Sequence, residues 1–391
     1  MNHGLLPSQR HAVAASFAHE GRITRVQRIC EAEHLDAIVA VGAGYATWLT
    51  DYHRYAGGLS ATILGASGGA EVVASAEEAP LVEREGSAER VHVYGEPGFG
   101  LDLDPLPRLV EALARVELLR RCTRIGVAGL SPGVLSGAGP AEVVAVDGPL
   151  AVVMAVKDRD EAEKIARSYG LCLEAQDAVA DGVAEGASEL ELFTRAHATA
   201  QLAAGEPVEF LADLLAGPAS AQVSGPVAVA GGRRPRDGEP VLADILVRAG
   251  GYWGDTCRTH VRGEAGELGG LGGLLERLRH VLDESVAGCR PGVRASEVYA
   301  AMARRVGEEL GGSSPMPHHG GHGLGLDPVC SPNLSPHDDT PLEAGMILAV
   351  EPGAYVPGRF GMRLENEYLV TPAGGVELHA ALASLIEGTN Q

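Results

Sequence analysis

Short apolar runs alternate with amphipathic stretches from residue 22 to about residue 150 of the chain. Residues 22–35 read RITRVQRICEAEHL and carry their apolar positions at helical spacing. The runs that follow, LDAIVAVGAG, ATILGA and EVVASA, are short, apolar and bounded by glycine. Such runs predict strands, and strands that alternate with helices are typical of an α/β domain.

The pattern changes near residue 156, where a long polar helix is predicted. The segment KDRDEAEKIARSYGLCLEAQDAVADGV places Asp160 four residues before Lys164, a spacing that supports a helix. A second helix is predicted from Ser188, where Ser-Glu-Leu-Glu fits a capping box, to about Ala204.

Beyond residue 240 the chain mixes predicted hairpins with predicted helices. Helices are expected near 271–288 and 296–310, and strands return in MILAVEPGAYV and MRLENEYLV. Hairpins covered by helices are typical of an α+β domain. We therefore expect an α/β domain over residues 1–156 and an α+β domain over residues 157–391.

Charge and cysteine content limit the possible partners. The chain has 31 basic and 52 acidic residues, a formal net charge of −21, which disfavours nucleic acid and anionic membranes as partners. No stretch has the length of a signal-peptide core or a membrane span. The six cysteines contain no CxxC pair. We expect a cytoplasmic enzyme with reduced thiols and neither a nucleic-acid nor a membrane partner.

The first candidate site lies in the run VLADILVRAGGYWGDTCRT. Gly250 and Gly251 can adopt the positive φ angles of a tight turn, and pairing around them sets Asp244 opposite Cys257. Asp255 is two residues from Cys257, so both aspartates project from the same face of the hairpin. Solvated aspartates at a strand edge are the alternative interpretation.

A second predicted hairpin brings two glutamates together. The runs ILAVEPGAYV and GMRLENEYLV flank a turn at residues 357–361, which brings Glu351 toward Glu365. A carboxylate in an apolar run is costly to bury without a partner, and a cation is one remedy. An ion pair with Arg363 is the alternative for either glutamate.

The third candidate element is the glycine-rich run PHHGGHGLGLD. Its glycines remove side chains around His322 and allow the backbone to approach a buried site. A lone histidine such as His318 or His319 is more often structural than a ligand. Four carboxylates and one imidazole form a hard donor set that suits paired Mn, Fe, Co or Zn ions. Two such ions can hold a bridging hydroxide and polarise a carbonyl oxygen.

The order of these residues resembles that of the creatinase, prolidase and aminopeptidase P superfamily. An Asp is followed after eleven residues by the Asp of DTCRT, then by the His of GHGLG, the Glu of EPG and the Glu of RLEN. The segments TWLTDY and AVKDRDEAEKI resemble the N-terminal domain and the domain junction of that superfamily. The resemblance implies a creatinase-type domain over 1–156, a pita-bread catalytic domain over 157–391 and a homodimer.

The resemblance also implies a role for each candidate residue. Asp244 would bind one metal, and Asp255 and Glu365 would bridge two divalent ions, with manganese the first expectation. His322 and Glu351 would complete the second site, and Glu351 would act as the base for the bridging water.

The resemblance implies a second contribution from the strand that carries Glu365. Arg363, two residues earlier on the same strand face, would hold the carboxylate of a substrate.

Two positions depart from the pattern of the peptide-cleaving members. These members typically carry a histidine seven residues after the metal-binding one, where this chain has Val329, and another near Ser224. Both imidazoles are understood to contact the substrate. Loss of such a donor costs about 3 kcal/mol of transition-state stabilisation.

Three functions are compatible with this sequence. The first is a dinuclear metal-dependent peptidase in which His318, or a group of the N-terminal domain, replaces the missing imidazoles. The polar loop of Tyr52, His53 and Arg54 would then line a neighbouring subunit's substrate pocket. The second is a metal-dependent hydrolase or lyase that acts on a small amide or other metabolite, with Val329 as an apolar wall. The third is a non-catalytic binding protein, which the retained ligand set disfavours.

Overall fold

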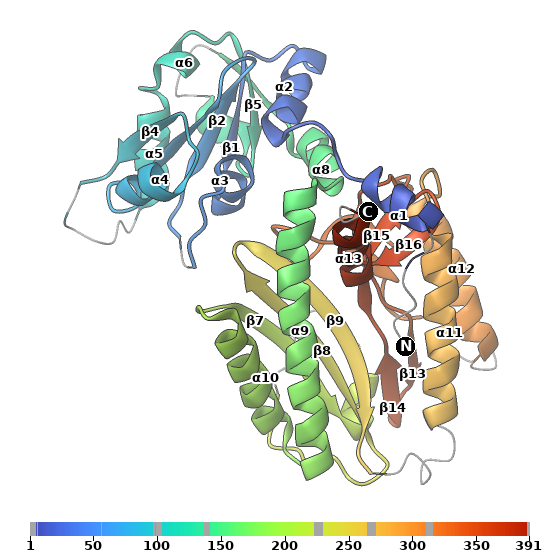
Figure 1. Cartoon of the computed structure of the whole chain (residues 1–391). Coiled ribbons are helices and arrows are strands. Elements are labelled where there is room, and N and C mark those ends of the chain that lie inside the picture. The colour runs from blue at the N-terminus through green and yellow to red at the C-terminus, as the bar shows by residue number, and fades with distance from the viewer. Residues whose placement is uncertain are drawn as a thin grey trace. The chain divides into compact units, whose positions relative to one another are not determined.

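The computed structural model describes the chain except residues 1–4, 6, 56, 97, 99–103, 137–140, 223–229, 264–270, 310–315 and 389–391. It divides into two compact units (Figure 1). The smaller unit is His19–Met154, and the larger unit combines Met1–Ala18 with Ala155–Gln391. The sequence placed the first residues with the N-terminal domain, whereas in the structure the chain up to Ala18 belongs to the larger unit. The amide of Ala18 donates to the carbonyl of Lys157 within that unit (2.9 Å).

The smaller unit is a mixed six-stranded sheet in the order β4-β3-β2-β1-β5-β6 with helices around it. Strand β1 pairs antiparallel with β2 and parallel with β5, and all five of its residues are buried. The strands are β1 (Ala37–Val41), β2 (Ala61–Gly65), β3 (Ala70–Ser75), β4 (Arg90–Tyr94), β5 (Arg124–Ala128) and β6 (Glu142–Ala145). The helices are α2 (Arg22–Ala32), α3 (Ala43–Thr50), α4 (Ala79–Glu85), α5 (Pro105–Leu113), α6 (Glu117–Arg120), α7 (Pro132–Leu135) and α8 (Asp147–Ala155), which ends at the boundary.

The larger unit contains a three-stranded sheet, β7-β8-β9, a five-stranded sheet, β11-β10-β12-β15-β16, and the ribbon β13-β14. The strands are β7 (Glu209–Ala216), β8 (Pro240–Ala249), β9 (Tyr252–Val261), β10 (Gly321–Gly323), β11 (Cys330–Asn333), β12 (Ile347–Val350), β13 (Gly353–Val356), β14 (Phe360–Arg363), β15 (Asn366–Thr371) and β16 (Gly374–Glu377). The helices are α1 (Pro7–Ala14), α9 (Arg159–Glu185), α10 (Glu189–Ala204), the 3-10 turn η1 (Gly217–Ala221), α11 (Leu271–Gly288), α12 (Ala295–Glu309) and α13 (Leu378–Gly388).

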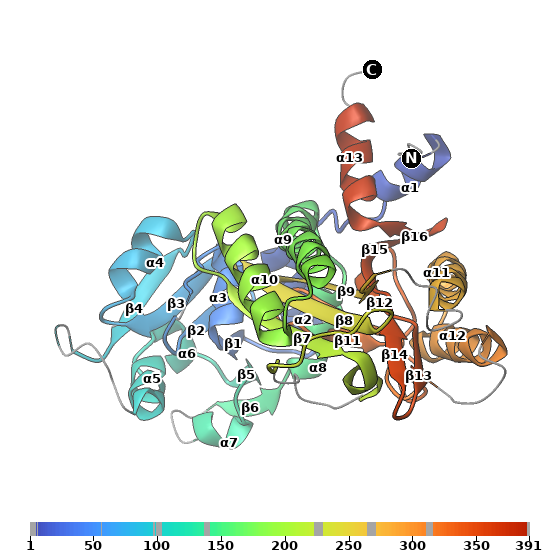
Figure 2. The same ribbon diagram turned by 90° about the horizontal axis from the view of Figure 1, so that it is seen from below.

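Helices cover these sheets on their outer sides. Helices α9 and α10 pack on β7-β8-β9, and both figures show α11 beside α12 and α1 beside α13 (Figures 1 and 2). Capping boxes start α9 at Asp158 and α10 at Ser188, the second as predicted. At Gly254 of β9 an added Cβ would lie 2.2 Å from the backbone nitrogen of Tyr169 in α9. The missing side chain therefore brings α9 directly against the strand that carries Asp255. No helix among the described residues is long and apolar enough to cross a membrane.

Candidate metal centre

The hairpin of β8 and β9 has the register that the sequence predicts. Gly250 and Gly251 form its turn with φ angles of 57° and 88°, and Asp244 pairs with Cys257. Asp255 is 3% exposed, so it is not a solvated strand-edge residue. Its backbone amide donates to a carboxylate oxygen of Glu367 (2.7 Å), a buried residue that the sequence analysis did not select.

The second hairpin is split by an interruption at the two glutamates. Val350 pairs with Asn366 in β12 and β15, and Gly353 pairs with Arg363 in β13 and β14. Both pairs share one register, which places the intervening Glu351 opposite Glu365. Pro352 has no N–H to donate, which is consistent with a break in the ladder at this position.

Backbone contacts hold both glutamates against neighbouring strands. The amide of Glu365 donates to the carbonyl of Cys257 (2.9 Å), so this glutamate is bound to β9. The amide of Glu351 donates to the carbonyl of Gly320 (2.9 Å), just before the histidine-bearing strand β10.

His322 lies in β10 with its ring turned into the carboxylate cluster. Gly323 allows the close approach of β11, because an added Cβ would lie 2.4 Å from the carbonyl oxygen of Ser331. The Nδ1 atom of His322 lies 3.0 Å from the carbonyl of Gly323. A proton on Nδ1 leaves Nε2 free as a ligand. Nε2 lies 3.5 Å from Oδ2 of Asp255 and 3.9 Å from Oε1 of Glu351.

Two groups of side chains have the spacing of metal ligands. Asp255, His322 and Glu365 form one group, and Asp244, Cys257 and Glu365 form the other; within each group the potential ligand atoms lie within 4.8 Å of one another. Glu365 belongs to both groups.

The electrostatics of the cluster favour cations. Among the described residues, Oδ1 of Asp244 and Oδ1 of Asp255 are buried with no hydrogen-bond partner. In the absence of a cation, burial raises the pKa of Asp244 to about 6 although Arg363 opposes the shift. Burial and the neighbouring carboxylates raise the pKa of Asp255 and of Glu365 well above their usual ranges. The residues thus fit a divalent pair, which would hold these groups ionised.

Arg363 is occupied by the candidate ligands themselves. Its Nη2 forms an ion pair with Oδ2 of Asp244, and its Nε lies 3.7 Å from Oε2 of Glu351. The sequence left open an ion pair between Arg363 and either glutamate. Such a pair is found with Glu351, at the long distance of 3.7 Å. Its Nη1 donates to the hydroxyl of Tyr355 (3.4 Å).

The two histidines before His322 differ in their surroundings. The side chain of His318 is 7% exposed, with Nε2 3.0 Å from the hydroxyl of Tyr355, and desolvation lowers its pKa to about 4. His319 is 35% exposed and places Nδ1 2.9 Å from Oε1 of Glu351. Burial acts to raise the pKa of Glu351, but His319, His318 and Arg363 lower it to about 2. The sequence did not indicate a role for Tyr355, and His319 was expected to be structural, because the contacts of both residues depend on tertiary packing.

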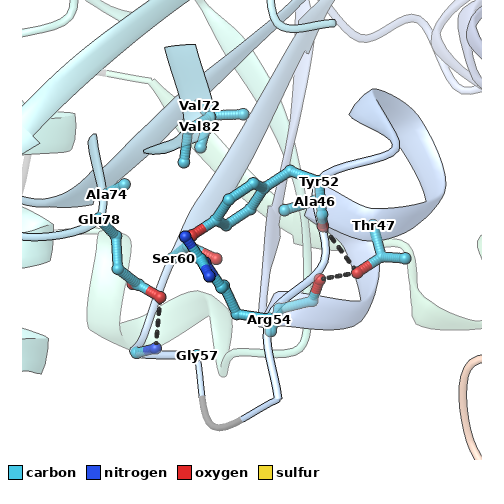
Figure 3. Close-up of a pocket in the computed structure, with 12 residues that line it drawn as sticks. Ala46, Thr47, Tyr52, Arg54, Gly57, Ser60, Val72, Ala74, Glu78 and Val82 are labelled. Atoms are coloured by element: carbon cyan, nitrogen blue, oxygen red, sulfur yellow. Dashed lines mark hydrogen bonds between the residues drawn. The ribbon is translucent and has the colours of Figure 1, made fainter. Parts of the chain in front are cut away.

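None of the predicted substrate residues that the structure describes belongs to the two groups with metal-ligand spacing. Val329 lies in a bend just before β11 and is 52% exposed, and Ser224 lies outside the described residues. Tyr52, His53 and Arg54 belong to the smaller unit. There Tyr52 is buried and lines a small pocket with Arg54, Glu78, Val72 and Val82 (Figure 3).

The part of the chain that carries this site matches a known protein family. The model of metallopeptidase family M24 matches residues 163–372, more than half of the chain and a span that holds all five candidate ligands. The Xaa-Pro dipeptidase of Pyrococcus furiosus is 27% identical over 267 residues, which cover 67% of this chain and 75% of that protein.

Solved structures show the same fold along nearly the whole chain. The prolidase from Pyrococcus furiosus superposes with a TM-score of 0.75 and 21% identity, covering 90% of this chain and 98% of that one. The N-terminal domain of the FACT complex subunit SPT16 from Cicer arietinum superposes with a TM-score of 0.66 and 13% identity, covering 97% of each chain. These likenesses confirm the predicted pita-bread fold. Similarity at this level does not by itself assign an activity.

Proposed function

Because the chain belongs to metallopeptidase family M24, and so to the prolidase, aminopeptidase P and creatinase superfamily, we propose that it uses two divalent ions to hydrolyse a C–N bond. A metal-dependent hydrolase is also the enzyme class that the sequence predicted. The observation that carries the proposal is the buried carboxylate cluster with its two unpartnered oxygens. Such oxygens are costly to bury unless a cation binds them.

We assign the ligands from the two groups of donors. Glu365 would contact both ions because it belongs to both groups, and Asp255 would bridge with it. Asp244 would complete one side, and His322 and Glu351 the other. The ions would supply an activated water and polarise the scissile carbonyl.

The protein groups around this pair have distinct tasks. The carbonyl of Gly323 fixes the ring of His322, so that its Nε2 points at the carboxylates. Glu351 remains ionised because His319 and Arg363 lower its pKa, so it can accept the proton of the attacking water. Arg363 would position Asp244, and it would reach a substrate carboxylate once cations replace it as the partner of that aspartate.

The substrate we favour is a short peptide, with X-Pro dipeptides tested first. Similar proteins are named Xaa-Pro dipeptidase and prolidase, and His318 lies next to the cluster with its Nε2 on the hydroxyl of Tyr355. A second candidate is a small amide or other metabolite. It is favoured by Val329, which offers half-exposed apolar surface where the peptide-cleaving relatives typically carry a histidine.

The test combines metal analysis with one substitution. We expect about two divalent ions per chain after reconstitution, and measurable cleavage of an X-Pro dipeptide that requires them. Val329→His should raise kcat/KM on the dipeptide if a missing donor limits peptide turnover. The exposed Leu202→His substitution, on helix α10, is the matched control and should leave kcat/KM unchanged.

Two outcomes would contradict parts of this proposal. If elemental analysis after the reconstitution step finds no bound metal and the activity is intact, the dinuclear mechanism is wrong. Negligible X-Pro cleavage by both wild type and Val329→His, together with turnover of small amides, would replace the peptide substrate with the second candidate.

Further properties remain part of the proposal. We expect manganese as the first metal to test, and a homodimer by analogy with the superfamily. A cytoplasmic location is supported by six cysteines that form no disulfide in the structure.

A further inference from the structure

One of the two ligand groups contains sulfur, which the five-residue set does not include. Cys257 lies in β9, is completely buried and pairs across the hairpin with Asp244. On its other side, the backbone of Cys257 forms an isolated antiparallel β-bridge with Glu365. Its Sγ and one carboxylate oxygen from each of these residues lie within 4.8 Å of one another.

These separations suit a single ion. Metal–sulfur bonds of about 2.3 Å and metal–oxygen bonds of about 2.0–2.2 Å place two ligands of one ion at most roughly 4.5 Å apart. Small side-chain movements therefore suffice to bring all three donors onto one cation.

An independent observation also points to a ligand at this position. Oδ1 of Asp244 is buried without a hydrogen-bond partner among the described residues, while Oδ2 is paired with Arg363. Leu242 and Tyr355 also pack against Cys257. A buried carboxylate oxygen without a hydrogen-bond partner, beside a buried thiol, is a suitable environment for a thiophilic cation.

The other cysteines differ in their contacts. The thiols of Cys122, Cys289 and Cys330 donate to backbone carbonyls at 3.3–3.4 Å. Among the described residues, Cys257 is the one cysteine found in a group with metal-ligand spacing. Cys289 is equally buried and lies in the core beside α11, which makes it a matched control.

We infer that Cys257 is a thiolate ligand of the ion held by Asp244 and Glu365, so that this half of the centre selects Zn²⁺, Co²⁺ or Fe²⁺ over Mn²⁺. The inference rests on the proposed dinuclear function. As the metal–sulfur bond forms, the S–H bond breaks and its proton passes to water. The other half, with His322, has nitrogen and oxygen donors only. The two halves of the centre then differ in the softness of their donor atoms. Because Mn²⁺ prefers hard oxygen donors, it suits the half that contains Cys257 less well than it suits the set of five oxygen and nitrogen ligands.

Cobalt substitution tests the inference in the full-length protein. The wild type, Cys257→Ser and Cys289→Ser are reconstituted with Co²⁺, and bound cobalt is counted by elemental analysis. We expect a thiolate-to-cobalt charge-transfer band in the near ultraviolet for the wild type and Cys289→Ser. Cys257→Ser should lose the band while retaining cobalt, and its preference for Zn²⁺ over Mn²⁺ should fall by about tenfold or more.

The possible results separate the inference from the function on which it rests. Two cobalt ions per chain without the band, or a band that survives in Cys257→Ser, would overturn the sulfur ligand and leave the dinuclear centre intact. No bound cobalt would overturn both. If Cys257→Ser does not fold, X-ray absorption of the wild type decides the question, because a sulfur scatterer at about 2.3 Å is required.

Discussion

Replacing Asp244 by asparagine should stabilise the chelated, metal-free protein, and should do so fully only when the pH is above the folded-state pKa of this carboxyl, about 6. Burial raises the pKa of this carboxyl from 3.8 to about 6 in the absence of a cation, even with Arg363 beside it. Ionisation is therefore more costly in the folded chain than in the unfolded chain. Asparagine keeps the shape of the neutral acid and cannot ionise.

The magnitude follows from the difference between the two pKa values. The shift from 3.8 to about 6 corresponds to about 3 kcal/mol. A group whose pKa is raised by folding stabilises the protein fully when the pH is below the pKa of the group in the unfolded state. That contribution is lost as the pH rises through the pKa of the group in the folded state. Asp244→Asn should match the wild type below pH 3.8 and exceed it by up to about 3 kcal/mol above pH 6–7.

Urea unfolding of both chelated proteins at a series of pH values measures this difference. His260 and His318, whose pKa values burial lowers to about 4, titrate in the same range, but their contribution cancels between variant and wild type. Asp36→Asn is a control of opposite sign, because amides of Thr123 and Arg124 lower the pKa of Asp36. A pH-independent difference for Asp244→Asn, or destabilisation at pH 7.5, would show that the arginine pair outweighs burial and would refute the reasoning.

Three further substitutions test the centre, the packing behind it and the smaller unit. Asp255→Ala should abolish activity and lower the metal content below that of the wild type while circular dichroism stays native; full metal binding would contradict its bridging role. Gly254→Ala should cost several kcal/mol in denaturant unfolding, because its Cβ would lie 2.2 Å from a backbone nitrogen of Tyr169, whereas Gly288→Ala meets no atom within 4 Å and should change stability by less than about 1 kcal/mol. If the polar loop reaches a partner's site, Arg54→Ala should lower kcat/KM without changing metal content, and an unchanged kcat/KM would end that hypothesis.

Local chemistry explains which parts of the fold could be predicted. The glycine pair at the tip of β8 and β9 determines one register, and so Asp244 meets Cys257 as expected. The capping box at Ser188 places the start of α10 for the same reason, since its partners are three residues apart. Predictions of this kind depend on neighbours in sequence.

Other features depend on contacts distant in sequence and could not be predicted. The chain up to Ala18 joins the larger unit, and nothing in its composition indicates that association. The sequence predicted that the second hairpin brings Glu351 toward Glu365, but not that the backbone of Glu365 also binds that of Cys257, a residue distant in the sequence. The contact of His319 with Glu351 likewise requires the packing of β10 against β12.

The metal centre and the choice of substrate depend on different kinds of structure. The candidate ligands lie on or beside hydrogen-bonded strands, so backbone register determines their spacing. Val329 lies instead in a half-exposed bend, where a new side chain disturbs no ladder. Substitution there can alter the substrate while the metal chemistry persists, which is how one fold supports several reactions. The retained ligand set is therefore an argument for hydrolysis and is neutral about peptides. The choice between a peptide and a small amide is therefore best tested at positions outside the ligand set, with Val329 first.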